Sequence, residues 1–417
     1  MSGVLLLGAD YYGTLAAARC YGAHGVDVTM ADETRGGRAL FSRFVRDKLV
    51  HPPLATAGAL VDWLVDFGER NPHTLLYPPN DHLAWLFAAE HDRLGRAFDT
   101  YAPPESAVFR LLDKPRLHDA CAAVGIDVPE TRVLDGGDGW ADGLRWPALI
   151  KPRTQVFLES GIKGFIVHDR AELDREIERF RALVRFAPVL TERHPEVAQP
   201  MVQEYLTAAE TSIFSVSGFV TEDGRAVCRA AMKVLQRPRK VGIGLCFESR
   251  ELDAALTERL VALCRHVGYH GAFEAEFIAD GGRHLLIDFN PRFYSQMAFD
   301  IARGVPLPML VYWAASGDRA RLDAELEAAQ QHRPAGDEVY CHRTMLDLVL
   351  TLQGLSGQMS RGDVRRWRAW VRTHAATMTD AVRDPADRVP ALVDAASWVR
   401  HFARHPRSFV RSFVLNR

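Results

Sequence analysis

The sequence predicts a multidomain protein of mixed class, with a Rossmann-like α/β domain first, an α+β region next and a mainly helical region last. Three observations indicate this. Short apolar runs alternate with helical patterns from the start of the chain, two alternating strands flank a Gly-Gly turn near residue 281, and the apolar spacing becomes helical from about residue 330. With 417 residues, 47% of them hydrophobic, the chain can build two or three domains.

The first part of the chain reads as successive βα units. Residues 4–8 predict a strand, 14–24 a helix and 26–30 the next strand, and further units follow at 57–70, 74–77 and 81–91. Asn80 and Asp81 follow a strand end, where open α/β sheets bind ligands, although Asp81 is equally well interpreted as a helix N-cap. Gly8 and Gly13 lack the Gly-x-Gly-x-x-Gly spacing, so nicotinamide binding is only weakly indicated.

The two alternating strands carry the clearest candidate site. Side chains two residues apart on a strand point the same way, so Asp288, Asn290 and Arg292 should share one face. The turn Asp280-Gly281-Gly282 should bring Glu276 alongside them. Carboxylate and amide oxygens suit Mg²⁺, and a guanidinium suits a phosphate oxygen. This pattern predicts a metal-nucleotide site, and the alternative is an ordinary hairpin whose polar face meets water.

Lysines are scarce, and their positions indicate where phosphate contacts should lie. Only six of the 51 basic residues are lysine, and five of these six lie between residues 114 and 240. Lys151 ends an apolar strand and Lys163 follows a loop, and such lysines form natural phosphate cradles. Lys233 opens a basic run before Gly242-Ile243-Gly244, for which a solvated loop is the alternative interpretation.

The ordered set Lys114, Lys151, Gln203-Glu204-Tyr205-Leu206, Glu276 and Asp288-x-Asn290-x-Arg292 resembles the ATP-grasp superfamily. The layout of roughly residues 1–320 is similar to carboxylate-amine ligases, including the D-aspartate ligase type. This resemblance implies four parts: a Rossmann-like pre-ATP-grasp substrate domain (1–108), an ATP-grasp N-terminal subdomain with a mobile lid loop (109–195), an ATP-grasp C-terminal subdomain with the metal site (196–328) and a helical C-terminal region (329–417).

The resemblance also implies a role for each matching residue. The catalytic residues should be Arg292, which faces the transferring phosphoryl group, and Lys163, which lies in or just after the lid loop 154–164. The metal ligands of Mg²⁺ or Mn²⁺ should be Glu276, Asp288 and Asn290. The residues that should bind ATP are Lys114, Lys151 and Lys233 at the phosphates, Gln203, Glu204 and Leu206 at the adenine, and Glu210 at the ribose.

Two departures from the family pattern bear on turnover. Most relatives carry Glu where this chain has Asp288, which is one methylene shorter. The lid has Val156, Phe157 and Leu158 where small residues are usual. These departures motivate the alternative of a nucleotide-binding regulatory module with little turnover.

The chemistry that the resemblance implies is ATP-dependent ligation. ATP would convert a carboxylate into an acyl-phosphate, which an amine then displaces, and ADP and phosphate would be released. A kinase or carboxylase of the same fold and a Rossmann oxidoreductase are the further alternatives. The small-molecule acid and amine are not identified; Asp10, Tyr11 and Asn80 are candidates to contact the donor, and Tyr294, Ser295 and Gln296 the acceptor.

Composition limits the partners and the compartment. A net charge of -2 gives no bias toward nucleic acid, no apolar run approaches the roughly 18 residues of a membrane span, and six scattered cysteines predict a reduced, cytoplasmic protein. The last residues are helical and arginine-rich. They either pack on the catalytic core or offer a surface to a partner or carrier protein, a second subunit or an anionic membrane.

Overall fold

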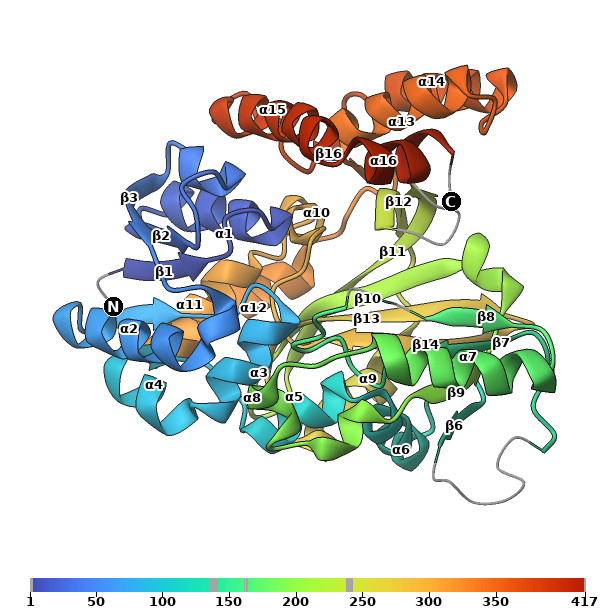
Figure 1. Ribbon diagram of the computed structural model, residues 1–417. Coiled ribbons are helices and arrows are strands. Elements are labelled where there is room, and N and C mark those ends of the chain that lie inside the picture. Colours follow the sequence, from blue (N-terminus) through green and yellow to red (C-terminus); the bar gives the residue numbers. More distant parts are fainter. Residues whose placement is uncertain (1–2, 135–141, 161, 163, 238–242, 416–417) are drawn as a thin grey trace.

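The computed structural model describes residues 3–134, 142–160, 162, 164–237 and 243–415, and three sheets organise them (Figure 1). The first is a parallel sheet in the order β3-β2-β1-β4-β5, with all its strands within the first 100 residues. Its strands are β1 (Gly3–Leu7), β2 (Val28–Asp32), β3 (Val45–Val50), β4 (Thr74–Leu76) and β5 (Asp99–Thr100). The helices α1 (Tyr12–Ala23), α2 (Ala57–Arg70), α3 (Asp81–Ala89) and α4 (His91–Ala97) alternate with them.

The strand order places a topological switch point between β1 and β4. The chain leaves β1 toward β2 on one side, and β4 lies on the other side. The loops after β1 and β4 therefore diverge at the carboxyl edge of the sheet, where open α/β sheets bind ligands. Tyr11 and Asn80 lie in these two loops. Asn80, and not Asp81, is the N-cap of α3, because its side chain accepts a hydrogen bond from the backbone N–H of Leu83.

The second sheet has four strands in the order β6-β9-β7-β8. They are β6 (Thr131–Val133), β7 (Ala148–Lys151), β8 (Phe165–Val167) and β9 (Met201–Glu204). The helices α6 (Lys114–Val124) and α7 (Arg170–Leu183) contact these strands, whereas α5 (Glu105–Leu112) and α8 (Pro188–Thr191) pack against the first domain. Since β9 pairs with both β6 and β7, it belongs to this sheet. β9 lies beyond the predicted boundary at residue 195, in the segment predicted as the next subdomain.

The third sheet has seven strands in the order β14-β13-β10-β11-β12-β15-β16. Its strands are β10 (Ile213–Val220), β11 (Ala226–Arg237), β12 (Ile243–Arg250), β13 (Gly271–Asp280), β14 (Arg283–Asn290), β15 (Val339–Cys341) and β16 (Met378–Asp380). The alternating residues Phe273, Ala275 and Phe277 of β13 are buried against α6 and α9 (Ala254–Val267). The opposite face of β13 is thereby left for polar side chains.

The C-terminal region is more closely joined to the core than a separate helical unit would be. Its strands β15 and β16 extend the third sheet, which the sequence pattern did not predict. Before this region the chain forms α10 (Met297–Ala302), α11 (Leu307–Ser316) and α12 (Arg319–Gln331). The helices of the region are α13 (Arg343–Leu355), α14 (Arg361–Thr373), α15 (Val389–Arg404) and α16 (Pro406–Phe409), followed by a π-helical turn at Val410–Val414. Of these, α13 to α16 form a layer at one end of the molecule (Figure 1).

Candidate active site

The hairpin of β13 and β14 gathers the predicted carboxylates on one face. Residue Glu276 lies directly opposite Asp288, and Glu274 lies opposite Asn290. The predicted turn forms with Gly281 and Gly282 at its centre, and both have positive φ, as this tight hairpin requires. The structure therefore brings these polar residues together, while the phenylalanines of β13 point into the core.

Two lysines from other elements neutralise the two carboxylates. The Nζ of Lys114, at the start of α6, donates to Oδ1 of Asp288 over 2.6 Å. The Nζ of Lys233, on β11, donates to Oε1 of Glu276 over 2.8 Å. Burial alone would raise the pKa of Asp288, but the Lys114 ammonium outweighs burial and holds that pKa below its usual value. Both carboxylates are thus held close to cations that also suit phosphate oxygens.

Arg292 is held in a fixed orientation just beyond β14. Its Nε donates to Oδ1 of Asp81 over 2.7 Å, its Nη2 to Oδ1 of Asn290 over 2.7 Å, and its Nη1 to the carbonyl of Phe293 over 2.9 Å. Asp81 therefore contributes as a partner of Arg292 and not as a helix cap. The hydrogen bond from Nη2 of Arg292 is accepted by Oδ1 of Asn290, the amide oxygen that had been predicted to bind a metal ion.

Glu274 is a site residue that the sequence interpretation missed. Its Oε1 accepts from Ser215 over 2.8 Å and from Gln296, and its Oε2 accepts from Asn290 over 3.1 Å. Burial and the adjacent Glu276 charge raise the pKa of Glu274 to about 7. The signal was present in the alternation Phe-Glu-Ala-Glu-Phe, but preference was given to the second glutamate.

These side chains line a polar cavity of about 350 Å³. Thr154 and Gln155 close it from the loop after β7, and Ile243, Gly244 and Phe247 from β12. The remaining lining residues are Asp81, Leu112, Lys114, Lys233, Glu274, Glu276, Asp288, Asn290, Arg292, Ser295 and Gln296. The two predicted acceptor contacts Ser295 and Gln296 are thus in the wall, whereas Tyr294 is buried and its hydroxyl donates to Asp300.

A second cavity of about 250 Å³ adjoins the first and shares Asp81, Gln155 and Arg292 with it. Tyr11, Asn80, His82 and Leu158 complete its lining, so it lies at the switch point of the first sheet. Two of the three predicted donor contacts, Tyr11 and Asn80, are therefore placed there. Asp10 is exposed and accepts instead from the backbone N–H of Arg38 over 3.4 Å.

Among the predicted nucleotide-binding residues of the second sheet, Lys151 and Gln203 are buried. The Nζ of Lys151 donates to Oε1 of Gln203 over 2.8 Å, and both side chains are buried. Burial, reinforced by the charge of Lys114, lowers the pKa of Lys151 to about 7. The carboxylate of Glu204 accepts from the backbone N–H of Glu130 over 2.9 Å. Leu206 precedes a short 3₁₀ turn, Thr207–Glu210, and Glu210 is its last residue. Gln236 donates to the carbonyl of Ala209 in this turn.

The first part of the predicted lid packs against the first domain. Val156 and Phe157 are buried, and the ring of Phe157 lies 5.5 Å from that of His82 and 5.7 Å from that of Trp85. The backbone N–H of Phe157 donates to Nδ1 of His82 over 2.7 Å. This hydrogen bond requires a neutral acceptor, and burial lowers the pKa of His82 accordingly. Lys163 lies outside the described residues.

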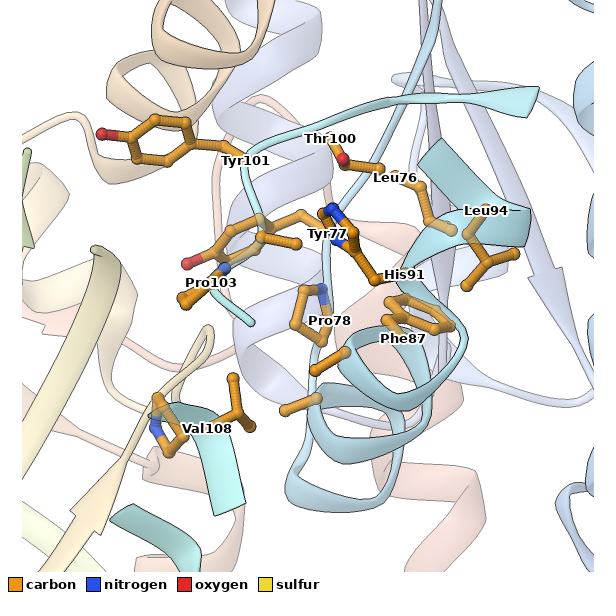
Figure 2. Close-up of a pocket in the computed structure, with 14 residues that line it drawn as sticks. Leu76, Tyr77, Pro78, Phe87, His91, Leu94, Thr100, Tyr101, Pro103 and Val108 are labelled. Atoms are coloured by element: carbon orange, nitrogen blue, oxygen red, sulfur yellow. The ribbon is translucent and has the colours of Figure 1, made fainter. Parts of the chain in front are cut away.

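A separate apolar pocket lies between β4, α3 and the segment before α5, with Tyr77, Pro78 and Phe87 around it (Figure 2). Its volume is about 20 Å³ and its lining is almost wholly apolar. A pocket of this size holds no more than a water molecule, so it is a packing gap and not a substrate site.

The donor set of the larger cavity fits a divalent cation that is completed by phosphate oxygens. Among the described residues, no group of three or more His, Cys, Asp or Glu side chains is arranged to hold a metal ion by itself. Mg²⁺ typically takes one or two carboxylates and fills its remaining positions with water and substrate phosphates. Glu276 and Asp288 would be those two carboxylates, and Asn290 is hydrogen-bonded to Arg292 and Glu274.

The weak dinucleotide signal has a packing explanation. A Cβ atom at Gly13 would lie 2.5 Å from the carbonyl oxygen of Tyr294, so glycine lets α1 approach the segment that follows β14. Gly8, with φ of 72°, supports the turn after β1.

No protein-family model matches the chain, and no curated protein matches it significantly in sequence. Solved structures do match. An L-amino acid ligase from Bacillus licheniformis aligns with a TM-score of 0.58 at 14% identity, covering 80% of this chain and 78% of that one. A biotin carboxylase from Campylobacter jejuni aligns with a TM-score of 0.59 at 14% identity, covering 75% and 71%. An N5-carboxyaminoimidazole synthetase from Staphylococcus aureus aligns with a TM-score of 0.55 at 13% identity, covering 76% and 77%. The overall fold is therefore the one that these three enzymes share.

Proposed function

From the ATP-grasp fold of this chain, we propose that it is an ATP-dependent ligase that activates a carboxylate as an acyl-phosphate and couples it to an amine. The observation that carries the proposal is the pair of ion pairs in one cavity, Lys114 with Asp288 and Lys233 with Glu276. A triphosphate would take the two ammonium groups, and the two carboxylates would then hold Mg²⁺. When bound, Mg²⁺ would neutralise the phosphate charge that develops during transfer.

The two adjoining cavities suit two reactants that must meet at Arg292. The acid would lie in the smaller cavity, near Tyr11 and Asn80, and the γ-phosphate in the larger one. A carboxylate oxygen of the acid attacks the γ-phosphorus, and ADP leaves with the electron pair of the broken P–O bond. Arg292 belongs to both linings, so its guanidinium can stabilise the charge on the phosphoryl oxygens.

The second step needs an amine next to the acyl-phosphate. The amine nitrogen attacks the acyl carbon, phosphate leaves, and the nitrogen loses a proton. Ser295 and Gln296 line the larger cavity beside Arg292, which suits them to orient the amine. The complete proposal is cytoplasmic, ADP-forming ligation of small molecules. ATP would bind at Lys114, Lys151, Lys233 and the 203–210 segment.

Two alternative functions of the same fold keep specific support. Two of the three similar structures carry names of carboxylating enzymes or their relatives, a biotin carboxylase and an N5-carboxyaminoimidazole synthetase, which favours bicarbonate as a second candidate acid. A regulatory module with little turnover is favoured by the shorter Asp288 and by the packed loop at Val156 and Phe157.

The deciding experiment is a hydroxylamine-trapping screen with Mg-ATP and a panel of carboxylic acids that includes amino acids and bicarbonate. We expect one class of acid to give a hydroxamate together with ADP, and the exposed-lysine variant Lys48→Met to behave like the wild type. AMP as the nucleotide product would overturn the acyl-phosphate mechanism. Tight ATP binding without turnover on the whole panel would favour the regulatory module.

A further inference from the structure

Helix α15 exposes an apolar stripe along its outward side. Leu392, Ala395, Val399 and Phe402 recur at helical spacing, and Leu392 and Val399 are each 70% exposed. The inward side of the same helix is fixed, because the buried Asp394 lies 3.3 Å from Nε of Arg38. The stripe therefore faces solvent as a consequence of how the helix docks and not because the helix end is loose.

The apolar surface continues beyond α15. An open groove of about 530 Å³ runs between α15 and α13, with Leu348, Leu352 and Trp398 in its lining. At the end of α13, Leu355 is 83% exposed, and Val410 and Leu415 after α16 are also exposed. All these elements belong to the layer of C-terminal helices at one end of the molecule (Figure 1). We call the combined surface of α15, the end of α13 and residues 406–415 the C-terminal apolar surface.

The exposed charge around this surface is mainly basic. Asp347 also lines the groove, but it lies 3.7 Å from Arg343 and 3.4 Å from Arg383. Arg404, Arg407 and Arg411 are exposed, and within the described part of the chain no carboxylate lies within ion-pair distance of any of them. Asp394 is the one acid of the described residues 388–415, and it is buried. Arginine side chains can extend along apolar surface and place their guanidinium groups among lipid phosphates.

We infer that the C-terminal apolar surface binds peripherally to an anionic lipid bilayer. Interfacial helices combine a large apolar side chain every third or fourth residue with flanking basic residues, and the attraction grows with anionic lipid. A protein partner would be expected to meet patterned charges of both signs, whereas this surface offers large apolar side chains spread over three elements and mainly basic flanks. The acid in its groove, Asp347, is already paired with Arg343 and Arg383. No helix of the described residues is long and apolar enough to cross a bilayer, so the contact would be at the membrane surface.

The test is sedimentation of the full chain with vesicles of phosphatidylcholine, alone or with about 30% phosphatidylglycerol, at salt concentrations of about 50 and 500 mM. We expect at least about tenfold more bound protein on the anionic vesicles at the lower salt, and a large loss at the higher salt. Leu392→Ser with Val399→Ser should reduce binding about tenfold, because it removes two apolar side chains from the membrane contact. The double variant should still fold, since both side chains are largely exposed. Val50→Ser, at an exposed valine on β3 outside this surface, should have no effect.

A charge pair of variants separates the electrostatic part. Arg404→Glu with Arg407→Glu should abolish binding to anionic vesicles, whereas Arg175→Glu on α7 should leave it unchanged. Absence of binding, or equal binding by all variants, would overturn the inference. It would also be overturned if the stripe variants abolish a dimer seen by sedimentation velocity, or the capture of an acidic amphipathic peptide, while vesicle binding stays intact. None of these readouts depends on turnover, so failure here is distinguishable from failure of the proposed ligase activity.

Discussion

The Nζ of Lys114 lies 2.6 Å from Oδ1 of Asp288, although 174 positions separate the two residues in the chain. The lysine belongs to the first turn of α6 and the aspartate to β14, so this ion pair ties the segment before the second sheet to the third sheet. A triphosphate would compete with Asp288 for the ammonium, and a divalent cation would compete with Lys114 for the carboxylate. Binding of Mg-ATP should therefore replace one ion pair by two new ones.

Substitution of Asp288 tests most directly whether Mg-ATP replaces this ion pair. Asp288→Asn removes a proposed metal ligand and leaves Lys114 without its counter-ion, so we expect ATP turnover to fall at least about 10²-fold. Asp288→Glu keeps the charge and adds one methylene, and it should retain turnover within about tenfold. Phosphate release with a saturating acid measures both. Equal activity of the Asn and Glu variants would contradict a role for this carboxylate in holding a metal ion.

Arg292 should not be replaceable by lysine. Its guanidinium donates to Asp81, Asn290 and the carbonyl of Phe293 at once, a fork that a single ammonium cannot reproduce. We expect Arg292→Lys to lower turnover on the order of 10²–10³-fold with a smaller change in the ATP dissociation constant. Arg283→Lys, in the exposed hairpin turn, is the matched control. A loss below about threefold would exclude Arg292 from the reacting groups.

Most of the fold could be predicted from local patterns, because apolar periodicity and turn residues predict the first domain and the hairpin. The hairpin at Gly281-Gly282 and the pairing of Glu276 with Asp288 are both confirmed. The two short strands β15 and β16 could not be predicted, since three residues give no periodic signal and the pairings of β15 with β12 and of β16 with β15 are long-range. Partners that are distant in sequence, such as Asp81 for Arg292, also depend on tertiary packing alone.

The site residues also divide into those that the sequence predicts and those whose partners depend on tertiary packing. The family resemblance placed Lys114 and Lys151 opposite Glu276 and Asp288. Lys114, Lys233, Glu276 and Asp288 line one cavity, whereas Lys151 is outside its lining and donates to Gln203. Spacing could not reveal that Asn290 would be committed to Arg292 and Glu274, because a short amide can face either a metal ion or its neighbours. The lid is a further case. Its glycine-poor composition was visible, but the packing of Phe157 against His82 was not.

Lys151 should take up a proton when Mg-ATP binds. Its pKa in the folded chain is lowered to about 7 from 10.5, so at pH 8 the side chain is mainly neutral. Phosphate oxygens beside it would favour the ammonium, and calorimetry in buffers of different ionisation enthalpy should show uptake approaching one proton at pH 8. Uptake should vanish at pH 6, where Lys151 is already charged, and in Lys151→Arg, which is charged throughout. Uptake that persists in Lys151→Arg would assign the proton to another group.

The lowered pKa of Lys151 also makes the free energy of unfolding depend on pH. Because the folded pKa lies below the unfolded value, the unfolded chain binds the proton first as the pH falls from about 10.5 to 7. The contribution of Lys151 to stability is therefore lost over that range, and Lys151→Met should flatten the dependence. Urea denaturation at pH 7 and pH 9 measures the difference.

Phe157 should hold the first part of the lid against the first domain. Its ring packs on His82 and Trp85 and its φ is 49°, an uncommon value for a bulky residue. Phe157→Gly removes the ring and relieves the backbone, so the segment 154–160 should exchange its amide hydrogens at least about tenfold faster. Phe165→Gly, on β8, is a control for general loss of an aromatic ring. Unchanged exchange at 154–160 in Phe157→Gly would show that Val156 alone fixes the loop.

Asp387 should be the residue that docks the C-terminal region on the first domain. Its carboxylate is almost fully buried and accepts from Arg19 Nε over 2.9 Å, from Ser42 Oγ over 2.7 Å and from the backbone N–H of Arg43 over 2.9 Å. Asp387→Ala leaves the largely buried Arg19 guanidinium without this partner, and breaking a buried pair costs roughly 3 kcal/mol or more. Asp384, 3.9 Å from the same guanidinium but more exposed, provides the matched control Asp384→Ala, which should cost less than about 1 kcal/mol. Thermal unfolding and limited proteolysis after residue 382 compare the two variants, and equal stability would place the docking elsewhere, at Arg38 and Asp394.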